Sequence, residues 1–128
     1  MNRSSNAARY GALAERAARE RYGLDADHTE WNDARTDNGR PVEVKSAMLN
    51  RASGHAGRFR IFERVHRRLA SEDGVYVFVA YRASGRGISV EKMRSVDADA
   101  VRLEFYGAGG HRDTKQAKVP VSEVFGRA

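Results

Sequence analysis

The first segment with a clear pattern of hydrophobic and polar positions is residues 6–22 (NAARYGALAERAARERY). It is rich in alanine, arginine and glutamate, and its apolar residues recur at helical spacing, so it predicts a helix. Ser4 or Ser5 is suited to cap the start of this helix, and Gly23 is suited to end it in a left-handed turn.

A β-hairpin is predicted after this helix, centred on Asn38-Gly39. Both central positions of a type I′ turn need positive φ, and this dipeptide adopts that conformation readily. The strand that leaves the turn, residues 41–45 (PVEVK), alternates in character. Its two valines therefore share one face of the sheet, and Glu43 and Lys45 share the other.

The rest of the chain predicts further alternation of helices and strands. Residues 75–81 (VYVFVAY) are apolar at every position, as expected of a central strand covered on both faces. The other expected elements are a loop at 50–57, a helix at 58–71, a strand near 88–90, a short helix near 97–101, a strand at 102–106, a turn at 107–110 and a helical turn from Ser122. This order predicts an α/β or α+β sandwich around a mixed sheet.

The composition bounds what this sequence encodes. A chain of 128 residues and 14.3 kDa is the size of one domain, with a mean hydropathy of -0.68. The longest apolar run, residues 75–81, is far too short to cross a bilayer, and no secretory leader is expected. The chain has no cysteine, which excludes disulfides, cysteine zinc sites and thiol nucleophiles. We expect a cytoplasmic protein that does not bind membranes.

The charge balance indicates a phosphate-rich partner. Lys and Arg total 23 against 17 Asp and Glu, the formal net charge is +6, and the pI is about 10.1. Such an excess of positive charge is typical of proteins that bind nucleic acid. An acidic partner protein is the alternative, and no helix combines a basic face with the apolar face that membrane binding needs.

Asp33, Glu43 and Lys45 are the candidate catalytic residues. Asp33 lies before the predicted turn of the hairpin, and Glu43 and Lys45 lie after it. Pairing of the two strands across the turn therefore brings all three residues together. Two carboxylates suit a divalent cation, to which the carbonyl of Val44 is a further candidate ligand. Lys45 is suited to orient a water or stabilise developing charge during phosphodiester hydrolysis.

This pattern, Asp33 followed ten residues later by Glu43-Val44-Lys45-Ser46, resembles the core of the PD-(D/E)xK nucleases. Helix residues 11–15 (GALAE) are similar to the family's preceding helix, which makes Glu15 a further metal ligand by resemblance; Glu20 is the less favoured choice. The resemblance covers residues 6–82, and residues 83–128 are interpreted as a sheet extension and tail. In size and layout the chain resembles archaeal-type Holliday junction resolvases.

The resemblance implies a restriction-endonuclease-like α/β fold, with a mixed central sheet flanked by helices, and a metal-dependent DNA endonuclease. It implies Mg²⁺ bound by Glu15, Asp33, Glu43 and Val44, and the sequence does not distinguish Mg²⁺ from Mn²⁺. Through the resolvases it also implies branched DNA as substrate and a homodimer. The alternative is a nuclease-fold protein that binds nucleic acid without cutting it.

Two departures from the family pattern stand beside the motif. Asn32 occupies the position before the motif aspartate, where proline is usual, and Asp37 is a second acidic residue close by. Aspartate is common beside turns for conformational reasons alone, which favours Asp33 as the motif residue.

Arginine and histidine residues complete the candidates. Arg51, Arg58 and Arg60 flank the glycine-containing loop and are either phosphate contacts or ordinary surface arginines. The four histidines are widely spaced and form no HxxxH or HExxH signature, so histidine ligation of a metal is not expected. The default interpretation of His66 is a partly exposed helix position.

Overall fold

The computed structural model describes residues 3–29, 32–107 and 115–126. Helix α1 (Arg3–Tyr22) is followed by the short strands β1 (Asp25–Ala26) and β2 (Ala34–Arg35) and by β3 (Pro41–Met48). Then come β4 (Arg58–Phe62), α2 (Glu63–Ser71), β5 (Val75–Ser84), β6 (Gly87–Asp97) and the 3-10 turn η1 (Ala98–Ala100). Strands β7 (Tyr106–Gly107) and β8 (Lys115–Pro120) and helix α3 (Val121–Phe125) end the described chain.

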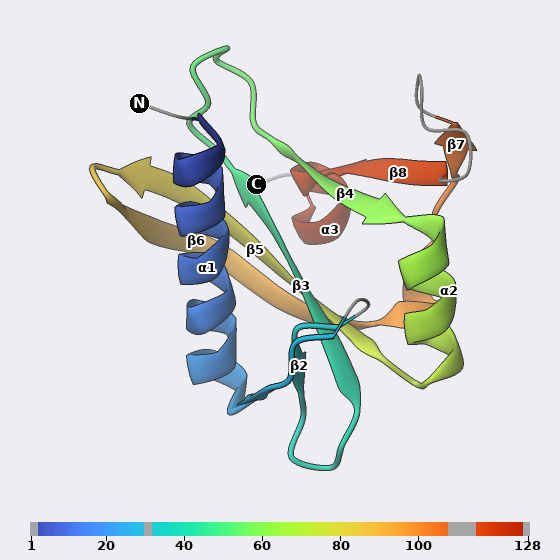
Figure 1. Ribbon diagram of the computed structural model, residues 1–128. Coiled ribbons are helices and arrows are strands. Elements are labelled where there is room, and N and C mark those ends of the chain that lie inside the picture. The colour runs from blue at the N-terminus through green and yellow to red at the C-terminus, as the bar shows by residue number, and fades with distance from the viewer. Residues whose placement is uncertain (1–2, 30–31, 108–114, 127–128) are drawn as a thin grey trace.

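Two sheets organise these elements. The larger has the strand order β1-β2-β3-β5-β6, in which only the β3–β5 pair is parallel, and the smaller has the order β4-β8-β7. Figure 1 shows α1 on one side of the large sheet and β4, β8 and α3 on the other. The mixed sheet flanked by helices is the restriction-endonuclease-like α/β architecture that the sequence predicted.

Strand β5 lies at the centre of two hydrophobic clusters. Its residues Val75, Val77 and Val79 pack with Ala14 and Ala18 of α1. Its alternate residues Tyr76 and Phe78 pack on the other side with residues of β4, α2 and α3. Every residue from 75 to 81 is buried, which confirms the prediction of a central strand covered on both faces.

Several local predictions were wrong. Residues 58–62 form strand β4 and the helix begins only at Glu63, because Phe59 and Ile61 alternate with exposed arginines and fill the core opposite β5. Residues 102–105 form no regular structure, and β8 was not foreseen. Helix α1 begins at Arg3, ahead of both serines proposed as caps, although it ends before Gly23 (φ 63°) as expected.

The hairpin exists, but its turn is not type I′. Gly39 has a φ of 86°, whereas Asn38 is not among the described residues with positive φ. The Thr36 amide donates to the Arg40 carbonyl (2.9 Å), and the Gly39 amide donates to the Thr36 carbonyl (3.0 Å). These bonds define a three-residue loop that ends on a left-handed glycine. The turn expected at Gly107–Gly110 falls largely outside the described residues.

Candidate active site

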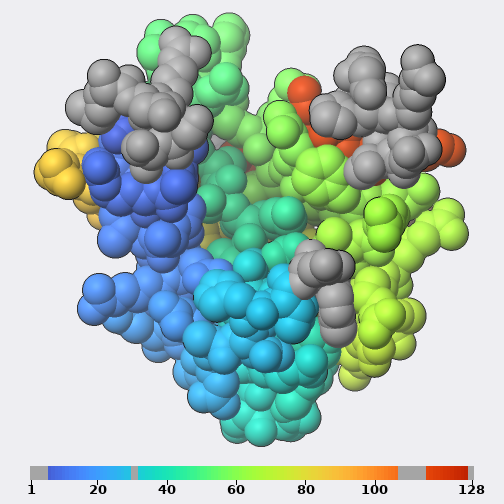
Figure 2. All heavy atoms as spheres, in the orientation of Figure 1, coloured from blue at the N-terminus to red at the C-terminus, as the bar shows by residue number. Residues whose placement is uncertain are grey.

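The candidate site lies where β2 separates from β3. The two strands pair at Ala34–Val42 and Arg35–Pro41. Among the residues that the structure describes, no strand pairs with this edge of β3 beyond Val42. The Asp33 amide still donates to the Val42 carbonyl (2.8 Å). In Figure 2 the surface over β3 lies between α1 and the β4–α2 segment. Side chains from α1, the β1–β2 connection and β3 therefore meet at this edge.

Asp33 is fixed to β3 by its own side chain. Its Oδ2 accepts a hydrogen bond from the Val44 amide (2.8 Å), at the position where a continuing strand would have supplied a carbonyl. The carboxylate thus replaces one bond of the missing ladder, and it also hydrogen-bonds with Glu15 and Glu43.

Glu43 and Lys45 extend from the same face of β3, as the alternation predicted. Lys45 Nζ lies 3.9 Å from Glu43 Oε2, and their side chains are only 20% and 12% exposed. Burial raises the pKa of Glu43 to about 9, with a further contribution from hydrogen bonding to Asp33, while the charge of Lys45 opposes the shift. Glu43 is therefore a carboxyl group that lacks enough positive charge nearby.

Glu15 reaches the same place from α1. Burial is the largest cause that raises its pKa, followed by the charge of Asp33, and hydrogen bonding to Asp33 acts in the same direction. Its side chain is 17% exposed. Glu20, the less favoured choice, instead accepts a hydrogen bond from Arg16 Nε (3.1 Å) on the exposed side of α1. The helix thus directs Glu15, and not Glu20, toward the motif aspartate.

His28 is the residue that sequence reasoning missed. Its Nε2 lies 3.5 Å from Glu15 Oε2, and single donor atoms of Glu15, His28 and Asp33 all lie within 4.8 Å of one another. Sequence spacing carried no signal for His28, because its two partners, Glu15 and Asp33, come from separate parts of the chain. Only its place a few residues before Asp33, in the segment that enters the hairpin, was visible beforehand.

The donor set fits a divalent cation. Three carboxyl groups share this site with the single ammonium group of Lys45, and their mutual repulsion and burial favour protonation of Glu15 and Glu43. A divalent ion would supply the missing positive charge, and carboxylate oxygens are the usual ligands of such ions. Glu15, Asp33 and Glu43 are the residues that would hold it, with His28 beside them.

The three candidate arginines lie outside this cluster. Arg51, Arg58 and Arg60 are all exposed. Arg60 pairs across the small sheet with Lys118, and Arg58 lies two residues away on the same face of β4. The buried Phe59 and Ile61 point the opposite way, into the core. The small sheet therefore presents a basic outer face formed by Arg58, Arg60 and Lys118.

His66 is a partly exposed residue of α2, as the sequence predicted. Its Nδ1 lies 2.8 Å from the Tyr76 hydroxyl, and burial lowers its pKa. Tyr76 is opposite Glu43 in the β3–β5 register, and burial together with the charge of Glu43 raises the Tyr76 pKa. These two residues form the wall on the α2 side of the candidate site.

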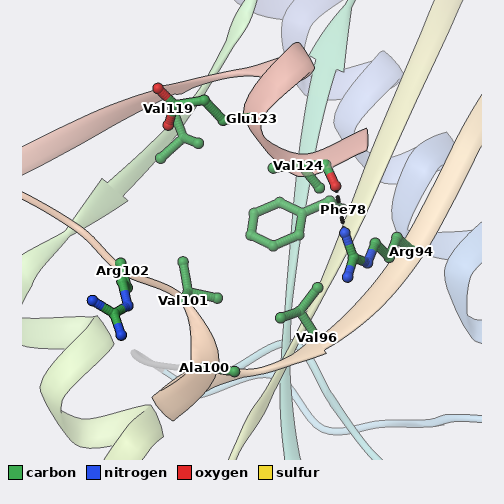
Figure 3. A pocket seen from close by; sticks show the side chains of 9 residues that line it. All are labelled: Phe78, Arg94, Val96, Ala100, Val101, Arg102, Val119, Glu123 and Val124. Atoms are coloured by element: carbon green, nitrogen blue, oxygen red, sulfur yellow. Dashed lines mark hydrogen bonds between the residues drawn. The ribbon is translucent and has the colours of Figure 1, made fainter. Parts of the chain in front are cut away.

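A separate pocket has no part in this cluster. It has a volume of about 420 Å³ and is lined by Phe78, Arg94, Val96, Ala100, Val101, Arg102, Val119, Glu123 and Val124 (Figure 3). Arg94 Nη1 donates to the Val124 carbonyl (2.6 Å), which ties β6 to α3. None of the carboxylates of the candidate site lines this pocket.

Comparison with known proteins identifies the family of the chain. The family model described as PD-(D/E)XK nuclease superfamily domain matches residues 1–126. The match includes residues 83–126, which lie outside the region that resembles the family by its motif. No curated protein matches the chain. Among the described residues, no helix is both long and apolar enough to span a membrane.

Proposed function

The chain belongs to the PD-(D/E)XK nuclease superfamily, and on that basis we propose that it is a metal-dependent endonuclease that hydrolyses phosphodiester bonds in DNA. A nuclease domain binds nucleic acid, and the superfamily typically uses divalent metals. We propose one nuclease domain across residues 1–128, with a divalent cation, Mg²⁺ or Mn²⁺, as its cofactor.

The observation that carries the proposal is the convergence of four groups on the unpaired edge of β3. Asp33 is hydrogen-bonded to the backbone of the strand that bears Glu43 and Lys45, and Glu15 approaches from α1. These four residues have the types and the relative order of the family motif. A merely structural cluster has no need for three partly buried carboxyl groups around one lysine, because their desolvation opposes folding.

We assign Glu15, Asp33 and Glu43, with the Val44 carbonyl, as holders of the metal. When bound, the ion polarises the phosphoryl oxygen and lowers the pKa of a water molecule. Lys45 Nζ, next to Glu43, orients the attacking water and stabilises the negative charge that develops on phosphorus-bound oxygens. The backbone amide of Val44 keeps Asp33 in place throughout.

Arg51, Arg58 and Arg60 are proposed to hold the DNA backbone. Arg58 and Arg60 are exposed on the basic outer face of the small sheet, and Arg51 lies in the loop between β3 and β4. Guanidinium groups suit phosphate oxygens because they offer paired donors in a fixed plane. Binding then depends on arginines, and cleavage depends on the carboxylates.

Branched DNA and a homodimer are proposed from the likeness of the motif and layout to junction resolvases. Two symmetric cuts in a four-way junction require two active sites related by a two-fold axis. The dimer is checked by the solution mass from sedimentation.

The first experiment compares a labelled four-way junction, linear duplex and single strand, each with Mg²⁺ or a chelator. We expect Mg²⁺-dependent paired nicks on the junction by the wild-type protein. Asp33→Asn is expected to lower cleavage at least about 100-fold with DNA binding retained, because it removes a metal ligand and not a phosphate contact. Asp37→Asn, at the exposed turn, is the matched control and should cleave normally.

The outcomes separate the alternatives. Cleavage of all three substrates would identify a general nuclease and remove the junction preference. Salt-sensitive binding without any cut would make this a non-catalytic nucleic-acid-binding protein. Loss of affinity for nucleic acid at physiological salt would favour an acidic protein partner. Full cleavage by Asp33→Asn would contradict the assigned site.

A further inference from the structure

We propose that His28 is a direct ligand of the metal, so that the site binds Mn²⁺ in preference to Mg²⁺. The inference rests on the proposed function, since it concerns the ion at that same site. It adds a nitrogen donor to the carboxylate set and commits to a metal preference that the motif residues alone leave open.

The distances fit ligands of one ion better than a direct pair. His28 Nε2 and Glu15 Oε2 are 3.5 Å apart, longer than the usual hydrogen bond of about 2.9 Å. Ligand atoms about 2.1 Å from an octahedral ion lie about 3.0 Å apart when adjacent and about 4.2 Å apart when opposite. The donor atoms of Glu15, His28 and Asp33 all lie within 4.8 Å of one another. The three donor atoms are thus close enough to one another to bind the same metal ion directly.

The backbone on both sides of His28 is held in place. The Asp27 amide donates to the Asp33 carbonyl (3.1 Å), and the Thr29 amide donates to the Asn32 carbonyl (2.9 Å). The Asp27 carboxylate also accepts from Arg35 Nε (2.5 Å). The segment that presents the imidazole is therefore joined to the segment that presents Asp33.

His28 is accessible to an incoming ion. Its side chain is 61% exposed, whereas that of Glu15 is 17% exposed. A histidine with a purely structural role in a small domain is usually packed in the core, and this one lies at the open side of a buried carboxylate pair. An ion that enters from solvent meets the imidazole first.

The chemistry of the ligands sets the preference. Mg²⁺ takes oxygen ligands almost exclusively and keeps several of its waters. Mn²⁺ shares the carboxylate ligands of Mg²⁺ but, as a first-row transition-metal ion, it also accepts an imidazole nitrogen, the commonest metal-binding side chain. One nitrogen donor beside Glu15 and Asp33 therefore adds more to the affinity for Mn²⁺ than for Mg²⁺.

The test measures metal binding by the intact protein without DNA. Titration calorimetry gives the Mn²⁺ and Mg²⁺ affinities, and pulsed electron paramagnetic resonance of bound Mn²⁺ detects coupling to a coordinated ¹⁴N nucleus. We expect that coupling in the wild type and its loss in His28→Ala. The Mn²⁺ affinity of His28→Ala should fall about 10-fold or more, while its Mg²⁺ affinity changes less than about 2-fold.

His55→Ala and Asp33→Asn complete the set. His55 lies exposed in the 50–57 loop, and its replacement should leave both affinities and the ¹⁴N coupling unchanged. Asp33→Asn should weaken both ions. Unchanged Mn²⁺ affinity or retained ¹⁴N coupling in His28→Ala would overturn the inference and leave the proposed function intact, provided that Asp33→Asn loses metal. Failure of the wild type to bind either ion would overturn both.

Discussion

Asn32 is the residue that most directly fixes the geometry of the candidate site. Its side chain is 1% exposed, and its Nδ2 donates to the carbonyls of Ala34 (3.0 Å) and Asp27 (3.1 Å). Its Oδ1 accepts from the Thr29 hydroxyl. The amide thus joins the segments on either side of Asp33. A proline, usual at this position in the family, has no side-chain donor for these bonds, so the departure from the motif has a structural function here.

Replacement of this amide should loosen the site. We expect Asn32→Ala to lower the free energy of unfolding by about 1–3 kcal/mol, because the buried Ala34 carbonyl and the partly buried Asp27 carbonyl lose their donor. Metal affinity should fall with it, since Asp33 and His28 lose their common support. Urea unfolding and calorimetry measure the two effects, and Asn38→Ala at the exposed turn is the control. Unchanged stability would show that water replaces the amide at no cost.

Glu43 makes the stability of the metal-free protein depend on pH. The pKa of Glu43 in the fold is about 9, above its ordinary 4.5, so the unfolded chain releases this proton at a lower pH than the folded chain does. The contribution of Glu43 to the free energy of unfolding is therefore fully present below about pH 4.5, and it is lost as the pH rises toward 9.

Glu43→Gln should remove this penalty. In the presence of a chelator at pH 8, we expect the free energy of unfolding of the variant to be about 1–3 kcal/mol higher than that of the wild type. Near pH 4 the two values should be equal. With saturating divalent metal the order should reverse, because only the wild type gains the binding energy of the ion. Denaturant unfolding at both pH values measures this. A lower stability of the variant at pH 8 in chelator would contradict it.

At the level of elements, the junction between α2 and β5 positions His66 and Tyr76 beside the candidate site. The Gly74 amide donates to the Leu69 carbonyl (2.7 Å), and the Ala98 amide donates to the Gly74 carbonyl (2.9 Å). A Cβ at Gly74 would lie 2.5 Å from Leu69 Cγ and 2.7 Å from the Leu69 carbonyl oxygen. The close approach requires glycine, because Leu69 is fully buried and backbone cannot move aside cheaply.

Gly74→Ala should therefore destabilise the protein by about 1–3 kcal/mol, as expected of overpacking. Gly11→Ala is the matched control on α1, where an added Cβ meets nothing within 4 Å. That change should stabilise the protein by about 0.4–1 kcal/mol, since alanine has less freedom to lose in a helix. Thermal unfolding of the two variants separates them. Equal shifts would contradict the proposed close contact.

At the level of the whole molecule, the two sheets divide the proposed work. The large sheet and helix α1 present the carboxylates, and the small sheet carries the basic outer face formed by Arg58, Arg60 and Lys118. The hydrophobic cluster around Phe59 and Phe78, whose rings lie 4.9 Å apart, fixes one sheet on the other. Phosphate contacts on one sheet can thus set the position of DNA relative to an active site on the other.

Removal of the basic face should weaken DNA binding without loss of metal. We expect the double variant Arg58→Ala and Arg60→Ala to reduce the slope of log affinity against log salt by about 2, one per lost phosphate contact. Calorimetry should show unchanged metal affinity. The double variant Arg82→Ala and Arg86→Ala, at the β5–β6 turn, is the control for net charge. An equal loss of slope in both would show that charge alone, and not this face, matters.

The sequence by itself determined the elements with a strong local pattern. The helix that ends at Gly23, the buried strand at residues 75–81 and the alternation that puts Glu43 and Lys45 on one face all follow from periodicity and turn chemistry. The family followed from the motif, because its residue types and spacing are themselves a local pattern.

Only the tertiary structure decided the rest. Residues 58–62 run directly into the helical pattern of residues 63–71, and they form a strand because β8, at residues 115–120, supplies their hydrogen-bonding partner. His28 joins Glu15 and Asp33 because α1 and the β1–β2 connection pack against the same edge of β3. Both features depend on contacts between residues far apart in the chain. Such contacts form only when the hydrophobic clusters on the two faces of β5 assemble.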